Sequence, residues 1–155
     1  MIRTLCILLI VLISSAGCGK RETHSDTNFM NETPTAVVTA SIDGSDFQAL
    51  SSNITVHFDS LLNRYILTAN QSGSMLTIEM SEIVVGQFSI DFDHYLISLE
   101  QDSVTYNGGN SPQGVIEITS VQSGKFSGTF SATLRNLFSA QEVTVTNGII
   151  TTVPF

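Results

Sequence analysis

Histidine, serine and aspartate are the side chains of this sequence that could take part in chemistry. His57 lies in the run Ile54-Thr55-Val56-His57-Phe58-Asp59, and His94 follows Asp91 and Asp93. Either imidazole could serve as a general base for a serine nucleophile. No Gly-x-Ser-x-Gly pattern singles out a serine, however, and nothing links a particular serine to either histidine. A hydrolase is therefore the third of three hypotheses for this chain, and we predict no catalytic residue.

Asp91, Asp93 and His94 also suggest the beginning of a metal site. The two carboxylates would project to the same side of an extended chain and could bind Ca²⁺ together with a carbonyl oxygen. An oxygen-rich calcium loop normally carries more ligands and a defining glycine, and both are missing here. We therefore expect a solvated loop at these positions, with no resident metal and no cofactor.

Cys18 stands in a pattern of a different kind. Arg3 is followed by an apolar run over residues 5–13 and then by the small residues Ser15-Ala16-Gly17, directly before Cys18. A charged start, a short apolar stretch and small residues at its end are typical of a secretory signal peptide. The residues Ser15-Ala16-Gly17-Cys18 are similar to the bacterial lipobox, with Ser15 where Leu is usual. The pattern predicts cleavage after residue 17 and lipidation of Cys18, and an ordinary signal peptide with a chance cysteine is the alternative.

Cysteine content and charge narrow the range of partners. Cys6 lies within the predicted signal peptide, so a mature chain that begins at Cys18 could form no internal disulfide. Cleavage would also remove Arg3, which leaves five cations against 14 carboxylates and a formal balance of −9. This charge and the lack of a basic stripe disfavour nucleic acid, so we expect no nucleic-acid partner. The lipid on Cys18 instead predicts that the chain is held at a membrane.

Beyond the signal peptide, residues 18–35 are expected to form a lipidated tether, because they are polar and lack periodicity. Residues 36–155 form the domain. Its strongest periodicity runs from Lys125 to Arg135, where apolar and hydroxyl-bearing residues alternate without a break. A period of two places each set on its own face of a β-strand.

Similar but shorter patterns predict strands at 36–42, 53–58, 64–69, 75–80, 86–90, 95–100, 103–106, 114–121, 142–146 and 149–153. Asn147-Gly148, between the last two, is the strongest hairpin signal in the sequence. Short strands with frequent turns indicate a single all-β domain of about nine to eleven strands. Its form is either an antiparallel β-sandwich or a small calycin-like β-barrel.

From about Val38 to the end, the chain resembles a family of Bacteroidota lipoproteins that carry a β-rich domain of unknown function. The resemblance rests on the residues from Ile42 to Ala49, from Gly124 to Ala132 and from Val143 to Gly148, and on the terminal Val153-Pro154-Phe155. Phe47 stands where many relatives have tryptophan. The resemblance implies a β fold and a place in the cell envelope, and it brings no active site.

Two triplets, Asp59-Ser60-Leu61 and Asp102-Ser103-Val104, resemble the acidic, hydroxyl, apolar sites at which Bacteroidota glycosylate exported proteins. Ser60 and Ser103 are therefore candidates for glycosylation. In a chain this rich in serine and threonine, such triplets also arise by chance.

Together these patterns predict a lipid-anchored domain of the cell envelope at the outer membrane, with its periplasmic or surface face left open. No catalytic constellation is visible, so we expect a non-enzymatic binding or accessory module whose partner is a protein, a glycan or a small molecule. The alternative is a carrier of small hydrophobic ligands, in which the alternating apolar face of a barrel lines a cavity. The same alternation fits a filled core equally well, so both hypotheses stay open.

Overall fold

The computed structural model describes residues 35–108 and 113–155. The predicted signal peptide, Cys18 and nearly all of the tether lie outside the described residues. Within the described ranges, no helix is long and apolar enough to cross a membrane. The elements of the fold are β1 (Val37–Ile42), β2 (Ser45–Leu50), the 3₁₀ helix η1 (Ser51–Asn53), β3 (Ile54–Asp59), β4 (Arg64–Gln71), β5 (Ser74–Met80), β6 (Gly86–Ser89), β7 (Tyr95–Gln101), β8 (Val104–Asn107), β9 (Gln113–Gln122), β10 (Lys125–Arg135) and β11 (Glu142–Pro154).

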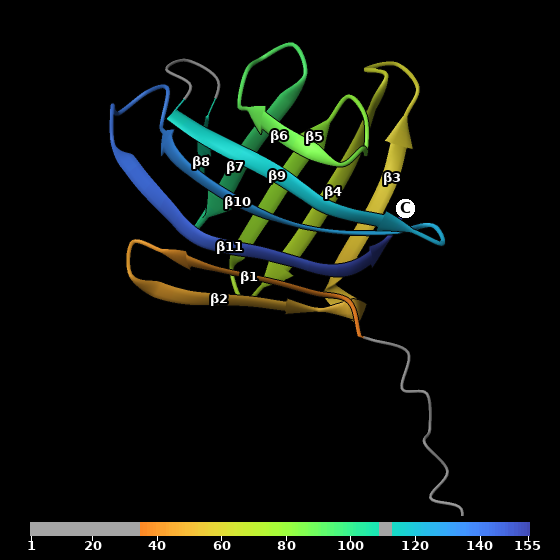
Figure 1. The fold of residues 1–155 in the computed structure, drawn as a ribbon. Helices are drawn as coiled ribbons and strands as arrows, with labels where there is room; N and C mark the ends of the chain where they lie inside the picture. The colour runs from red at the N-terminus through yellow and green to blue at the C-terminus, as the bar shows by residue number, and fades with distance from the viewer. Residues whose placement is uncertain (1–34, 109–112) are drawn as a thin grey trace, which may run out of the picture. The chain divides into compact units, whose positions relative to one another are not determined.

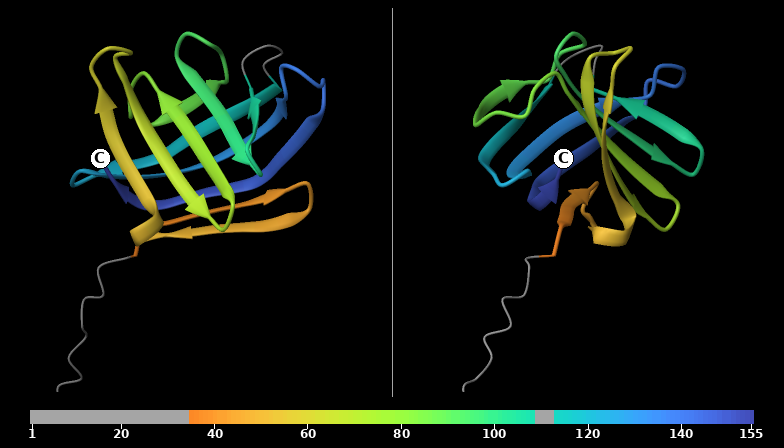
Figure 2. Two further views of the ribbon diagram at one scale, coloured as in Figure 1. Left: turned by 180° about the vertical axis from the view of Figure 1, so that it is seen from behind. Right: turned by 90° about the vertical axis from the view of Figure 1, so that its right-hand side faces the viewer.

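All of these strands belong to one antiparallel sheet that curls into a nearly closed barrel (Figure 1). β10 lies at its centre, because β11 pairs with one edge of β10 while β9 and β8 pair with the other. One branch contains β6, β9, β10, β11, β1 and β2, and the other runs from β8 through β7, β5 and β4 to β3. The strands of the two branches cross at a steep angle (Figures 1 and 2). The prediction of a single all-β domain, with a small barrel as one of its two forms, is confirmed.

The alternation of residue types explains how the core is filled. On β10, Phe126, Phe130 and Leu134 are buried, while the hydroxyl-bearing residues between them are half-buried or exposed. Burying a side chain of this size contributes about 1.5–3 kcal/mol. Both branches supply side chains to one core cluster, whose largest fully buried members include Leu67, Leu76, Ile78, Met80, Ile97, Leu99, Ile116, Ile118, Phe126, Leu134 and Ile150. The two branches are therefore held together mainly by the shared core, because among the described residues strand-to-strand hydrogen bonds connect them only where β10 pairs with β8.

The edges of the barrel are closed by a few specific contacts. At one corner, Arg135 of β10 pairs with Asn107 of β8. On the far side, the backbone N–H of Gln48 in β2 donates to Oε1 of Gln71 in β4 at 2.9 Å. The C-terminal Phe155 closes the seam beside β3. Its ring centroid lies 5.9 Å from that of Phe126 on β10 and 5.9 Å from that of Tyr65 on β4, and the Tyr65 ring lies 5.0 Å from that of Phe58 on β3.

The predicted hairpin at Asn147-Gly148 is wrong. β11 continues from Glu142 to Pro154, and Asn147 takes a φ of 52° inside the strand. The pairing of β11 shifts register here against both β10 and β1, as in a β-bulge. Both halves of β11 pair with the same two neighbours, so the hydrogen bonds and buried area on both sides outweigh the local preference for a turn.

A further strand, β2, is not predicted from the sequence. Only Phe47 and Ala49 of its six residues are buried, and the rest, such as Asp46 and Gln48, are exposed. Polar and acidic residues of this kind are depleted in strands, which hides the signal. β1 provides the backbone partners for β2 through a tight turn at Asp43-Gly44, where both residues have positive φ.

Candidate functional site

Three loops at one end of the barrel share one local structure. They connect β3 to β4, β6 to β7 and β10 to β11, and all three lie at the upper end of the barrel (Figures 1 and 2). Each begins with an Asp or Asn whose side-chain Oδ1 accepts hydrogen bonds from the backbone N–H groups two and three residues later. The donors are Leu61 (2.8 Å) and Leu62 (3.1 Å) for Asp59, Asp93 (2.9 Å) and His94 (2.6 Å) for Asp91, and Phe138 and Ser139 (both 2.8 Å) for Asn136. Because this Asx geometry holds a short loop in one conformation, we call these segments the Asx loops.

The Asx loops expose large apolar side chains. Leu61 and Phe138 are the extreme cases, at 95 % and 98 % exposed. Side chains of this kind are normally buried, because burial removes apolar surface from water. Neighbouring positions on the Asx loops and on the loop between β5 and β6 are also exposed, and we call the whole set the apolar rim: Leu61, Leu62, Val84, Val85, Phe92, Leu137 and Phe138. Large apolar side chains that are exposed together at one end of a domain are typical of interaction sites.

The tight turns elsewhere in the barrel are built differently. Asp43-Gly44, Ser72-Gly73, Asp102-Ser103 and Ser123-Gly124 contain only polar residues and glycine, and each has at least one residue with positive φ. Three of them, Asp43-Gly44, Asp102-Ser103 and Ser123-Gly124, have positive φ at both central residues, a conformation that matches the twist of the strands they connect. They lie at the lower end or the flanks of the barrel (Figures 1 and 2). The exposed apolar loop residues are thus gathered at the end that carries the Asx loops.

Polar contacts tie the Asx loops to the barrel and to each other. Arg64, at the base of the first loop, forms an ion pair with Glu79 (Nη1 to Oε2, 2.9 Å) and donates from Nη2 to the Phe92 carbonyl oxygen at 2.6 Å. Asn136, only 7 % exposed, donates from Nδ2 to the Thr105 carbonyl oxygen of β8 at 3.0 Å. These bonds link the first two loops together and hold the third against β8. The three Asx loops are therefore preorganised in the free protein.

A hollow of about 360 Å³ opens beside the second Asx loop. Its lining includes Glu82, Asp91 and His94, together with the rings of Phe88 and Tyr95. The two rings are stacked, with centroids 4.3 Å apart and an interplanar angle of 15°. Apolar surface and carboxylates thus meet at one place on the rim.

Two titratable groups of this hollow are perturbed. Burial raises the pKa of the Asp91 carboxyl, but its hydrogen bonds with His94, Tyr95 and Asp93 together outweigh this and hold the pKa below its usual value. Burial also raises the pKa of the Tyr95 phenol, more than a hydrogen bond with Ser81 lowers it, and the charge of Glu82 raises it further. At neutral pH the hollow therefore presents an ionised Asp91 beside a neutral phenol.

The candidate catalytic and metal residues are only partly brought together. Asp91 Oδ2 lies 3.4 Å from His94 Nδ1, on an exposed loop. In residues 35–108 and 113–155, no three His, Cys, Asp or Glu side chains form a group that could hold a metal ion. Asp91 instead uses Oδ1 to shape its own loop. His57 is exposed on β3, and the described part of the chain shows no hydrogen bond between a serine hydroxyl and either histidine.

The candidate modification sites are placed as follows. Ser60 is exposed in the first Asx loop, and Ser103 is exposed in the turn between β7 and β8, with a φ of 65°. Both hydroxyls are accessible, and their glycosylation stays a prediction. Cys18 lies outside the described residues, so its lipidation stays a prediction as well.

Sequence reasoning missed the apolar rim. The available signal was an Asp or Asn followed within three positions by large apolar residues, outside any predicted strand. Asp59-Ser60-Leu61-Leu62 and Asn136-Leu137-Phe138-Ser139 both have this form. This sequence pattern indicates an Asx turn, but only the structure shows that the apolar side chains point to solvent.

The interior of the barrel is occupied by side chains. Leu67, Leu76, Ile97 and Leu99 are fully buried and belong to one cluster. Of the two arrangements that the alternation allows, this packing corresponds to the filled core, and it gives the carrier hypothesis no support.

Comparison with known proteins assigns the chain to a family. Neither a curated protein nor a solved structure matches the chain significantly. The family described as "Domain of unknown function (DUF6252)" matches residues 34–154, a span that includes every strand from β1 to β11. The chain therefore belongs to the DUF6252 family of domains of unknown function.

Proposed function

We propose that this protein is a non-enzymatic docking module of the cell envelope, anchored by lipid on Cys18 at the outer membrane, which binds another protein through the apolar rim. The observation that carries this proposal is the exposure of Leu61, Phe92 and Phe138 on three loops that are each held in place by an Asx side chain. A loop that is already ordered loses little conformational freedom when it binds.

The exposure has no evident role in folding. Phe138 is 98 % exposed, so its ring contributes almost nothing to the core, yet the loop that carries it is fixed by a buried Asn136. Energy at protein interfaces is concentrated in a few aromatic and large apolar anchors of this kind. Phe138 and Leu61 are the anchors that we assign to the rim.

The point at which the described domain begins fits an anchored module. Thr35 and Ala36 lie beside η1, since the Ser51 hydroxyl donates to the Ala36 carbonyl oxygen at 3.3 Å. In Figures 1 and 2 this point is at the lower end of the domain, away from the Asx loops. A chain that is anchored through its N-terminus would thus leave the rim available to a partner.

The anchoring half is tested with Cys18→Ser. We expect the parent chain, expressed in its own host, to incorporate labelled palmitate and to fractionate with membranes, and the variant to do neither. Recovery of the parent protein as a soluble, unlabelled chain would contradict the anchor and would leave the docking half untouched.

The docking half is tested by placing the photo-reactive p-benzoylphenylalanine at position 138 in living cells. Position 149 is the matched control, because Ile149 is 49 % exposed on the flank of the barrel, on β11. We expect one discrete protein adduct from position 138 and none of that mass from position 149. Adducts to lipid alone, or the same adducts from both positions, would overturn the docking role.

A further inference from the structure

The charge around the apolar rim points to the chemistry of its partner. We infer that the rim receives a segment of protein that is cationic as well as apolar, with Lys or Arg beside a large apolar side chain. This inference rests on the docking role proposed above and names the class of partner.

The first observation is the charge of the domain. The described residues contain three basic side chains, Arg64, Lys125 and Arg135, against eleven carboxylates. Arg64 is already paired with Glu79, and Lys125 is placed at the start of β10, next to the tight turn with β9. Arg135 is exposed at the end of β10, directly before the third Asx loop, and is the one basic side chain of the described residues beside the rim that has no ion pair with a carboxylate. A field of this sign attracts basic partners and repels acidic ones.

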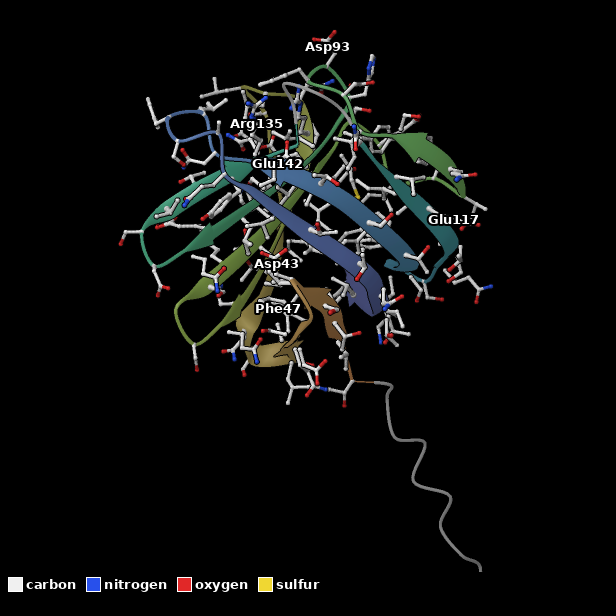
Figure 3. All side chains as sticks on the ribbon, turned by 90° about the vertical axis from the view of Figure 1, so that its left-hand side faces the viewer. Asp43, Phe47, Asp93, Glu117, Arg135 and Glu142 are labelled. Atoms are coloured by element: carbon white, nitrogen blue, oxygen red, sulfur yellow. The ribbon has the colours of Figure 1, made fainter. Side chains whose placement is uncertain are left out.

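The second observation is where the carboxylates lie. Asp59, Glu82, Asp91 and Asp93 belong to the first two Asx loops or to the loop between β5 and β6, so they lie among the rim residues of those loops. The third Asx loop, which carries Phe138, contains no carboxylate and directly follows Arg135. Figure 3 shows Asp93 at the tip of the upper end of the barrel. An acidic fringe around exposed apolar anchors complements a surface with the opposite charge and the same apolar character.

The third observation is the hollow beside the second Asx loop. Its volume of about 360 Å³ accommodates one long side chain, and Glu82 and Asp91 line it next to the stacked rings of Phe88 and Tyr95. A guanidinium or ammonium group there would meet two carboxylates and aromatic surface, both of which favour cations. Phe92, on the same loop, would contact the apolar part of the segment.

Other occupants fit less well. The acidic fringe opposes an anionic membrane surface, which binds basic and not acidic loops. Nucleic acid is disfavoured by the same charge. A protein segment that combines both features satisfies the apolar anchors and the carboxylates at once.

The test replaces two carboxylates of the hollow by amides, which removes their charge and keeps the size of the side chains. In the variant Glu82→Gln/Asp91→Asn, the Asn amide oxygen can still accept the loop hydrogen bonds of Asp91, since Asp and Asn serve equally well in such caps. The matched control, Glu100→Gln/Glu117→Gln, changes the net charge by the same amount away from the rim. Glu117 lies on β9 on the flank of the barrel, below the end that carries Asp93 (Figure 3).

The probe is a displayed library of short random peptides, selected on the purified domain (residues 35–155) at low salt. We expect the selected peptides to combine Lys or Arg with Leu, Phe or Trp, and to lose affinity at high salt. Their Kd should rise about tenfold on Glu82→Gln/Asp91→Asn, as two partly screened ion pairs would give, and should not change on the control.

The outcomes separate the two proposals. Peptides that lose binding on Phe138→Ser but carry no cations would overturn the charge inference and leave the docking role standing. Selection of no peptide that responds to Phe138→Ser, together with an absent protein adduct at position 138, would overturn both. Binding of the domain to phosphatidylglycerol vesicles that is lost in Phe138→Ser would replace the protein segment by a membrane.

Discussion

Asn136 and Phe138 have opposite roles in the third Asx loop, and this makes the pair a sharp test. Asn136 is buried and makes four side-chain hydrogen bonds: it donates to the Thr105 carbonyl oxygen and accepts from the Phe138 N–H and from the N–H and hydroxyl of Ser139. Phe138, two residues later, is almost entirely exposed. We expect Asn136→Ala to destabilise the domain strongly and Phe138→Ser to leave its stability unchanged.

The magnitude follows from these contacts. Each hydrogen bond contributes about 0.5–1.5 kcal/mol net. The N–H groups of the loop can turn to water when Asn136 is truncated, whereas the Thr105 carbonyl oxygen loses its partner, so the sum lies at about 2–4 kcal/mol. For a domain of this size, that lowers Tm by roughly 8–15 °C. Phe138→Ser should change the free energy of unfolding by no more than about 0.5 kcal/mol.

The assay is urea unfolding of the purified domain followed by far-UV circular dichroism, with the m-value compared between variants. Asn136→Asp is the intermediate case, because it keeps the Oδ1 acceptor and loses the Nδ2 donor. Equal destabilisation by Asn136→Ala and Phe138→Ser would refute the reasoning, since Phe138 would then be a packing residue and not a docking anchor. An unchanged stability of Asn136→Ala would show that the loop does not depend on this side chain.

Three other predictions concern the barrel itself. Gly128→Ala should destabilise the domain by more than about 3 kcal/mol, because the added Cβ would collide with the backbone carbonyl of Glu117 on β9. Gly124→Asn is the control, because Gly124 is at a turn position with a φ of 70° and open space for a Cβ. This variant should unfold at nearly the parent temperature. Phe155→Ala should cost about 1–2 kcal/mol by opening the seam beside β3, measured as a fall in Tm, and an unchanged Tm would show that the terminal ring does not close the barrel. The raised pKa of Tyr95 means that its neutral form is favoured in the folded state, so its contribution to stability is complete below about pH 10 and is lost as the pH rises through the higher folded pKa. Tyr95→Phe should remove this part of the alkaline loss of stability in urea titrations between neutral and high pH, and an identical pH profile in both proteins would contradict it.

The agreement between sequence and structure is closest where a strand is set by its own residues. The strand from Lys125 to Arg135 has the same bounds in prediction and structure, because its alternation is unbroken and its apolar face is wholly buried. The disagreements occur where neighbours decide. β2 exists because β1 supplies its backbone partners, and Asn147-Gly148 becomes a bulge because β10 and β1 hold both halves of β11 in line.

The candidate site shows the same division. The sequence alone predicts that Asp91, Asp93 and His94 form a solvated loop, and the structure adds that Asp91 shapes that loop by accepting two backbone hydrogen bonds. The sequence could not show that the β3–β4 and β10–β11 loops, whose residues Leu61 and Phe138 are 77 positions apart, lie at the same end of one barrel. Their common location depends on the order in which the strands pair.

What this sequence determines by itself is therefore local: the period of two that makes strands, the polar turns with glycine and the acidic balance. These depend on side-chain chemistry and on φ and ψ preferences over a few residues, which the order of amino acids states directly. What only the tertiary structure decides is which strands become neighbours, and hence which loops meet and which apolar side chains stay outside the core. Those outcomes depend on burial and pairing between residues far apart in the chain, and so the apolar rim becomes visible only in the folded domain.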